Sequence, residues 1–368
     1  MAKKVLINAY MEGNLGDDLM IWILAKRYPK VIFQVFTHPE YKERYKAVKN
    51  IKVYSAQDRY VKWAEQYWKR KTHGQEDFYL MKMRKADALV QIGGSIFPQN
   101  HIWELVYLFN LKYREICEKV FVCGANFGPY KDEDFVERYR DLFERTESVC
   151  LRDRHSYQLF SDIPTVRYAP DLVFGYEPSE DRQIRQKKQV LISVIQMKDR
   201  DGDFAINGYY DAYMKFMSKL TEKYVDSGYE IRFVCFCKDQ GDYEAAKEIE
   251  AGLPEEKRKK ISHYIYEYDI EEAVAQFEEC EIVIGTRFHS IILGWLKGKK
   301  VLPIVYDQKT LHTLEDCSMQ NFVRLEDLKY ADVEEITEKI EAFPEILREK
   351  YVKDAQIHFE KLDCFLGK

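Results

Sequence analysis

Residues 282 to 294 read IVIGTRFHSIILG. The apolar run Ile282–Gly285 is typical of a short buried strand, and the apolar stretch that follows Ser290 is typical of a helix. Gly285 marks the turn between them, and Arg287 and His289 lie in that turn. A strand, a glycine turn and a helix in this order form the repeating unit of a parallel sheet that is covered by helices on both faces.

The same alternation extends outward through most of the chain. Short apolar runs are separated by longer amphipathic stretches, so the sequence predicts a parallel α/β fold. The predicted strands are Val5–Ala9, Val31–Phe36, Ile51–Tyr54, Ala88–Ile92, Val120–Gly124, Ser148–Leu151, Val190–Ile195, Ile231–Cys237, Ile261–Ile265, Ile282–Gly285 and Val301–Tyr306. The clearest predicted helices are Leu19–Arg27, Ile102–Cys117, Phe135–Arg145, Tyr210–Val225 and Tyr243–Ala251.

A polar and charged stretch, Tyr176–Lys188, interrupts the alternation. At 368 residues the chain is long enough for two domains of roughly 150 residues each. We therefore expect two Rossmann-like domains facing a central cleft, over residues 1–178 and 179–332, followed by helices over 333–368 that cross back to the first domain. Such sheets bind ligands at the carboxyl ends of their strands, so we expect functional residues in the strand-to-helix loops.

The composition narrows the class of protein. A net charge of −5 argues against a general nucleic-acid binder, because we expect no face with a large basic surplus. The sequence has no run of 18 apolar residues and no signal-peptide pattern, so we expect a cytoplasmic protein. The 8 cysteines form no CxxC pair, and several lie in apolar runs, so we expect reduced, buried thiols and no metal site.

The loop Glu12–Asp18 follows the first predicted strand. Gly16 lets a ligand approach the backbone at the start of a helix, where free N–H groups attract anions. The loop lacks the GxGxxG spacing of a dinucleotide site. The alternative is a structural one, in which Asp17 or Asp18 is the N-cap of the helix.

Two further loops after predicted strands contain glycine and small polar residues. Gly93-Gly94-Ser95 follows Ala88–Ile92, and the loop that contains Asn126 follows Val120–Gly124. Paired glycines at a strand end indicate close approach of the backbone to a ligand or, alternatively, only a tight turn.

Arg152 and Arg287 both follow predicted strands and are candidates for binding an anion. A guanidinium group matches a carboxylate or a phosphate with two parallel hydrogen bonds. The alternative for Arg152 is a structural ion pair with Asp153 or Asp171. His289 lies two residues beyond Arg287 at a helix start, and histidine can transfer protons near neutral pH.

Taken in chain order, these loops resemble the motifs of the polysaccharide pyruvyl transferase family. The ordered set covers roughly residues 8–310. The matching pieces are Asn14-x-Gly16-Asp17, Gly93-Gly94, Gly124-x-x-x-Gly128-Pro129, Arg152-Asp153-x-x-Ser156, Pro170-Asp171, Gly285-x-Arg287-x-His289 and Val305-Tyr306-Asp307-x-Lys309.

The resemblance implies a GT-B-like fold, with the acceptor side in the first domain and the donor side in the second. It implies phosphoenolpyruvate as the donor and a cyclic ketal formed on two hydroxyls of one sugar, in an exopolysaccharide or cell-wall glycan. The expected partners are therefore phosphoenolpyruvate and a glycan or lipid-linked saccharide, with no cofactor and no metal. The resemblance also implies that Arg152 and His289 are essential for donor binding or turnover.

As a hypothesis, Arg152 and Arg287, aided by Lys309, bind the two anionic groups of phosphoenolpyruvate. His289 protonates C3 of the enol, and Asp17 is the candidate base for the sugar hydroxyl. The other candidate substrate-binding residues are Asn14, Gly16, Gly93, Gly94, Ser95, Asn126 and Ser290.

Two positions depart from the family pattern. Ser95 stands where a third glycine is common, and Gln196 stands where members often carry an arginine. Two alternatives follow for Gln196: weaker binding of the donor, or replacement of the missing arginine by Lys198 or Arg200. Two other functions stay open. One is a glycosyltransferase that uses a nucleotide sugar, and the other is a non-catalytic glycan- or anion-binding protein.

Residues Arg59–Lys85 combine aromatic side chains with basic ones. Tyr60, Trp63 and Tyr67 recur at helical spacing and share one face of a predicted helix. Basic residues beside exposed aromatics suit an anionic membrane surface, so the stretch predicts a peripheral contact with the inner membrane face. The alternative is an amphipathic helix that packs its aromatics on the first domain, and Glu65 dilutes the positive charge.

Overall fold

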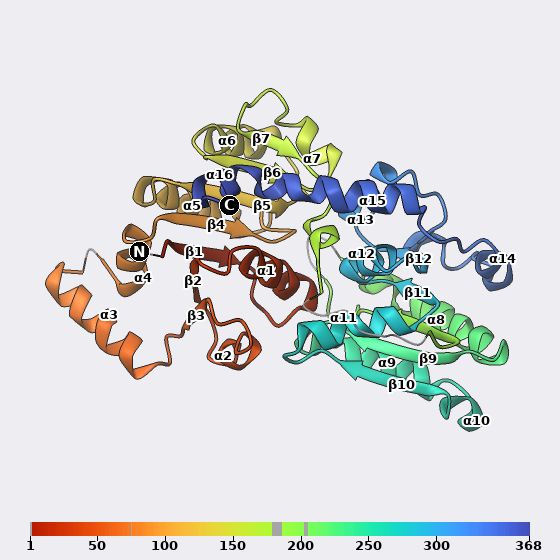
Figure 1. Cartoon of the computed structure of the whole chain (residues 1–368). Helices are drawn as coiled ribbons and strands as arrows, with labels where there is room; N and C mark the ends of the chain where they lie inside the picture. Colours follow the sequence, from red (N-terminus) through yellow and green to blue (C-terminus); the bar gives the residue numbers. More distant parts are fainter. Residues whose placement is uncertain (1, 75, 179–185, 202–204) are drawn as a thin grey trace. The chain divides into compact units, whose positions relative to one another are not determined.

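In a computed structural model the chain forms two compact units, each built on a parallel sheet (Figure 1). The first unit comprises Met1–Met11, Leu19–Leu172 and Asp354–Lys368, and the second comprises Glu12–Asp18 and Val173–Lys353. The predicted α/β fold with two Rossmann-like domains is confirmed.

The structure describes residues 2–74, 76–178, 186–201 and 205–368. The polar stretch that predicts the junction between the domains, 176–188, therefore lies in large part outside the described residues.

The sheet of the first unit has seven strands in the order β3-β2-β1-β4-β5-β6-β7, and all neighbours are parallel. The order reverses at β1, which pairs with β2 on one side and β4 on the other. The strands are β1 (Lys4–Ala9), β2 (Ile32–Phe36), β3 (Ile51–Tyr54), β4 (Ala88–Ile92), β5 (Val120–Ala125), β6 (Ser148–Leu151) and β7 (Val166–Tyr168).

Helices cover both faces of this sheet, and the central strands are therefore buried along their whole length. Every residue of β4, β5 and β6 is buried, as expected where helices pack on both faces. The helices are α1 (Leu15–Arg27), α2 (Tyr41–Arg44), α3 (Arg59–Lys71), α4 (Phe78–Arg84), α5 (Trp103–Ile116), α6 (Glu133–Glu144), α7 (Arg154–Gln158) and α16 (Glu360–Leu366), with a 3-10 helix, η6 (Ala355–Phe359).

The sheet of the second unit has six strands in the order β10-β9-β8-β11-β12-β13. They are β8 (Gln189–Ser193), β9 (Glu230–Cys235), β10 (Ile261–Ile265), β11 (Ile282–Gly285), β12 (Lys300–Val305) and β13 (Val323–Arg324). The helices are α8 (Tyr210–Asp226), α9 (Asp242–Ala251), α10 (Glu255–Arg258), α11 (Ile270–Glu279), α12 (Phe288–Leu296), α13 (Gln308–Asp316), α14 (Val333–Glu338) and α15 (Glu345–Asp354).

The chain's last residues complete the first unit. Arg27 binds the Asp363 carboxylate through Nε and Nη2, at 3.0 and 2.6 Å, and Tyr28 donates to the same carboxylate at 2.7 Å. His358 is buried and lies 2.7 Å from the Pro170 carbonyl oxygen. These contacts fix the tail to the first sheet.

Candidate functional site

Four neighbouring strands of the first sheet bring the predicted site residues of that unit together. Gly94 follows β4, Asn126 follows β5, Arg152 follows β6 and Asp171 follows β7. Because β4, β5, β6 and β7 are consecutive in the sheet, their carboxyl ends meet at one edge. The first unit therefore holds one polar cluster at the place where such sheets bind ligands.

Arg152 is the centre of this cluster and is buried. Its Nη1 donates to the Asp171 carboxylate at 3.0 Å, and its Nη2 donates to the Asn126 amide oxygen at 2.7 Å. Ser95 donates to the same amide oxygen at 3.3 Å. The ion pair with Asp171 is the structural alternative that the sequence leaves open for Arg152.

Gly94 is glycine because the guanidinium of Arg152 lies against it. A β-carbon at Gly94 would lie 2.5 Å from both terminal nitrogens of Arg152. The neighbouring Gly93 has φ of +148°, which residues with a β-carbon rarely adopt. The two glycines thus let the backbone pass close to a buried cation.

The tail residue His358 lies near this cluster. Burial lowers the pKa of His358 to about 4, and the Pro170 carbonyl and the Asp171 carboxylate oppose the shift. His358 is therefore a neutral group that donates from Nε2, not a proton carrier at neutral pH.

In the second unit, Arg287 forms a buried ion pair with Asp242. Its Nε donates to the Asp242 carboxylate at 2.9 Å, Nη2 pairs with the other carboxylate oxygen, and Nη1 donates to the Gln240 side chain at 2.6 Å. Burial alone would lower the pKa of Arg287, but Asp242 holds it above its usual value. The guanidinium is thus charged and held in one orientation.

His289 lies at the second position of α12 and packs against the loop that carries Asn14, Gly16 and Asp17. A β-carbon at Gly16 would overlap the imidazole at Nδ1. The Asn14 side chain accepts a hydrogen bond from the Gly16 N–H at 2.9 Å, which shapes the turn. The backbone N–H of Leu15 donates to the Phe236 carbonyl at 3.0 Å, so the loop is tied to the end of β9.

The two aspartates of this loop have different surroundings. Asp18 is buried and accepts a hydrogen bond from the Tyr266 hydroxyl at 2.9 Å, which gives it a structural role. Asp17 is half-buried. Of the two, Asp17 is the less buried residue.

Ser290 and Lys309 differ in what they offer a ligand. The Ser290 hydroxyl is buried, lies 2.6 Å from the Ser193 hydroxyl and donates to the Arg287 carbonyl at 2.6 Å. It is engaged in holding the turn. Lys309 is half-buried, and its Nζ lies 3.2 Å from the Asp307 carboxylate. The pKa of Asp307 is lowered: burial alone would raise it, but the charge of Lys309 and the hydrogen bonds from Thr310 outweigh burial.

A polar hollow of about 570 Å³ lies at the carboxyl ends of β8 and β9. Gln196, Arg200 and Gln240 line it together with three aspartates, Asp199, Asp201 and Asp239. Gln240 connects the hollow to Arg287. The Gln196 side chain accepts from the backbone N–H groups of Met197 and Lys198, at 2.9 and 3.1 Å. Of the two cations considered as replacements for an arginine at 196, Arg200 lines the hollow, whereas Lys198 pairs with the Glu248 carboxylate at 3.0 Å.

Reasoning from the sequence missed Asp242 and Gln240, the partners of Arg287. Asp242 opens α9 just after β9, and Arg287 follows β11. Since β9, β8 and β11 are neighbours, the two ends meet at one edge, but their order in the sheet cannot be read from the sequence. The available signal in the sequence is that Asp242 is an acidic residue that follows a strand of the same domain as Arg287.

No group of three or more histidine, cysteine, aspartate or glutamate side chains suited to a metal ion occurs within residues 2–74, 76–178, 186–201 and 205–368. The helices that the structure describes are all too short or too polar to cross a membrane.

The two Rossmann-like units define a GT-B-like fold, and solved structures share it. UDP-N-acetylglucosamine 2-epimerase from Rickettsia bellii matches with a TM-score of 0.57 at 11% identity, over 100% of this chain and 97% of that one. Anabaena Alr3699/HepE in complex with UDP-glucose matches with a TM-score of 0.54 at 10% identity, over 100% and 98%. At such low identity the likeness concerns the fold alone.

The chain belongs to the polysaccharide pyruvyl transferase family, whose sequence profile matches residues 14–308. The amylovoran biosynthesis protein AmsJ of Erwinia amylovora is 23% identical over 256 residues. That match covers 65% of this chain and 61% of the relative's length.

Proposed function

We propose that this protein transfers a pyruvyl group from phosphoenolpyruvate to two hydroxyls of a glycan sugar, with a cyclic ketal and phosphate as products. The observation that carries the proposal is the family match over residues 14–308, which includes Arg152, Arg287 and His289. The name of the relative AmsJ supports a polysaccharide as the acceptor.

Pyruvyl transfer requires a proton donor, a base and positive charge at fixed positions. In the proposed reaction His289 gives a proton to C3 of phosphoenolpyruvate. The methylene group at C3 becomes a methyl group, and C2 becomes electrophilic. One sugar hydroxyl bonds to C2, the bond between C2 and the phosphate oxygen breaks, and the second hydroxyl closes the ketal. The two hydroxyls lose two protons. One replaces the proton given by His289, and the other leaves with the phosphate.

His289 is placed beside the proposed donor site. It lies at the start of α12, where the helix N-terminus favours a bound anion such as phosphoenolpyruvate. The same N-terminus disfavours a protonated imidazole, so the bound donor has to supply the negative charge that offsets this effect. Asp17 is the proposed base for the sugar hydroxyl. It belongs to the loop that contacts the imidazole, and it is half-buried rather than sealed in the interior.

Arg152 and Arg287 are proposed to bind the anionic groups of the donor, each held in place by its aspartate. Asp171 and Asp242 balance the two guanidinium charges, so the excess positive charge for a highly anionic donor has to come from elsewhere. In the second unit we assign the additional attraction to Lys309, whose charge Asp307 offsets in part, and to the N-terminus of α12. Arg200 adds no excess positive charge, because three aspartates line the same hollow.

A phosphate-release assay tests the proposal. The protein is incubated with phosphoenolpyruvate and a panel of free and lipid-linked saccharides, and in parallel with UDP-sugars and the same acceptors. Phosphate release that depends on both phosphoenolpyruvate and a saccharide supports pyruvyl transfer. UDP release instead would identify a glycosyltransferase, and a bound saccharide without either product would identify a binding protein.

A further inference from the structure

Helix α3 has two faces with different surroundings. Val61 and Ala64 are buried, and with Trp68 they pack against Phe78 and Met81 of α4. This inward face accounts for the attachment of the helix to the first unit. The positions between these residues are left facing solvent.

The outward face carries exposed aromatic side chains, of which Tyr60 also contacts the ring of the buried Phe78, with centroids 5.7 Å apart. Trp63 is 62% exposed, and Tyr60 and Tyr67 are also exposed. The Trp63 and Tyr67 rings stack on each other, with centroids 5.7 Å apart and an angle of 17° between the planes. The alternative in which these aromatics pack on the first domain therefore holds for Trp68 but not for Trp63 and Tyr67.

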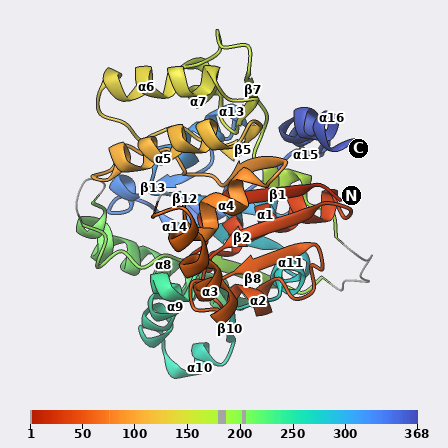
Figure 2. The same cartoon turned by 90° about the vertical axis from the view of Figure 1, so that its left-hand side faces the viewer.

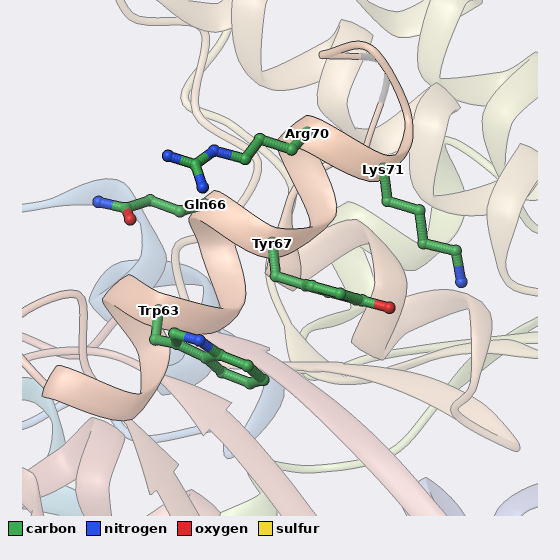
Figure 3. A pocket seen from close by; sticks show the side chains of 5 residues that line it. All are labelled: Trp63, Gln66, Tyr67, Arg70 and Lys71. Atoms are coloured by element: carbon green, nitrogen blue, oxygen red, sulfur yellow. The ribbon is translucent and has the colours of Figure 1, made fainter.

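Cations flank the stacked rings. Figure 3 shows Trp63, Tyr67 and Lys71 extending to one side of the helix and Gln66 and Arg70 to the other, around a shallow hollow of about 330 Å³. Within the described part of the chain, Arg70 and Lys71 form no ion pair with a carboxylate, whereas Lys69 pairs with Glu65.

The charge of α3 contrasts with that of the whole protein. Five of its 13 residues are basic and one is acidic, while the chain carries a net charge of −5. An acidic protein that gathers cations around exposed aromatic rings on one surface helix has a surface complementary to an anionic layer.

A second exposed apolar row lies on α5. Leu108 is 59% exposed, and Leu105 and Phe109 beside it are exposed as well. Helix α4 lies between α3 and α5 and contacts both, and all three helices lie on the side of the first unit that faces the viewer in Figure 2. Exposed apolar side chains of α5 and exposed aromatic side chains of α3 thus both occur on helices at this side of the first unit.

We propose that α3, with the exposed row of α5, binds the first unit to the surface of an anionic lipid membrane. The helix lies flat, since its 13 residues span about 20 Å and its inward face is held by α4. Tyr60, Trp63 and Tyr67 enter the headgroup region, where amphipathic rings are stable, and Arg70 and Lys71 bind lipid phosphates. The inference rests on this surface alone and goes beyond the proposed function.

The test is co-sedimentation of the full chain with vesicles of phosphatidylcholine, with or without a minor fraction of phosphatidylglycerol. We expect binding to the anionic vesicles at low salt and its loss at high salt. Arg70→Gln with Lys71→Gln should weaken the partitioning about 20- to 30-fold. Lys215→Gln with Lys219→Gln, which removes two exposed charges from α8, is the matched control and should leave binding unchanged.

Trp63→Ala tests the aromatic part and should weaken binding to anionic vesicles at every salt concentration. Three results overturn the proposal: no binding at low salt, equal binding by the α3 charge variant and the wild type, or a dimer in solution that Trp63→Ala dissociates. The dimer would make this face an interface between copies of the chain. Binding of an anionic polysaccharide but not of vesicles, abolished by the same variants, would assign the surface to a glycan instead.

Discussion

The imidazole of His289 packs directly on the α-carbon of Gly16, so that a β-carbon at position 16 would overlap Nδ1. The loop after the first strand and the turn before α12 belong to the same compact unit through contacts of this kind. A glycine that sequence reasoning ascribes to ligand approach is thus required, first of all, by a neighbouring histidine.

Gly16→Ala should therefore impair turnover without unfolding the protein. The new methyl group displaces the imidazole, and a misplacement of about 1 Å can cost about 10²-fold in rate. Turnover and melting temperature are measured on the same preparation. Gly208→Ala is the control, because a β-carbon there meets no atom within 4 Å. Unchanged turnover in Gly16→Ala would show that the position of His289 does not matter to the reaction.

His289→Ala should reduce kcat about 10²- to 10⁴-fold, since general acid catalysis contributes about that much. The melting temperature should fall by only a few degrees, about the effect of 1 kcal/mol. His101→Ala, at an exposed position, should change neither quantity. A folded His289→Ala protein with near-normal transfer would remove His289 from the mechanism.

Arg152→Lys should raise the KM for phosphoenolpyruvate, because lysine keeps the charge beside Asp171 but loses the fixed geometry of the guanidinium. Asp171→Asn is the comparison. It breaks the same buried ion pair, which typically costs about 3–5 kcal/mol of stability, but it leaves the arginine in place. Donor affinity is measured by calorimetric titration and stability by urea unfolding. Loss of stability in both variants with unchanged affinity would make Arg152 a structural residue.

His358 should make stability depend on pH. Its pKa is about 4 in the folded protein, against an ordinary value of 6.5, so between these values the unfolded chain binds a proton that the folded chain does not. The stabilisation is complete above pH 6.5 and is lost as the pH falls toward 4, by up to about 3 kcal/mol. His358→Gln should show a smaller loss between pH 7 and 5 in urea unfolding than the wild type. An identical pH dependence in both proteins would contradict the assignment.

The sequence is sufficient to predict most strands because buried parallel strands are nearly continuous apolar runs. Ile51–Tyr54, Ala88–Ile92 and Ile282–Gly285 have the predicted bounds. The strands β7 and β13 were not predicted. Both lie at sheet edges and are only three and two residues long, so they have no apolar run to reveal them.

The site is less predictable because strand order decides which loops meet. Arg152 and Asp171 are close in sequence, and their pairing was one of the stated alternatives. Arg287 and Asp242 are 45 residues apart in the sequence. They meet because the sheet places β9 and β11 on either side of β8, so that the loops after both strands lie at the same edge. The tail, in contrast, was predicted as helices, and α14, α15 and α16 lie within residues 333–368.

The central claim is that phosphoenolpyruvate is the donor, and the fate of its carbon atoms tests this most directly. The protein is incubated with phosphoenolpyruvate labelled at C3 and the saccharide that gives phosphate release, and the product is analysed by NMR and mass spectrometry. We predict that the label appears in a methyl group of a ketal bound to two oxygens of one sugar, with one phosphate released per ketal, and that His289→Ala abolishes both. A product without the label, formed only when a nucleotide sugar is supplied, would contradict the account.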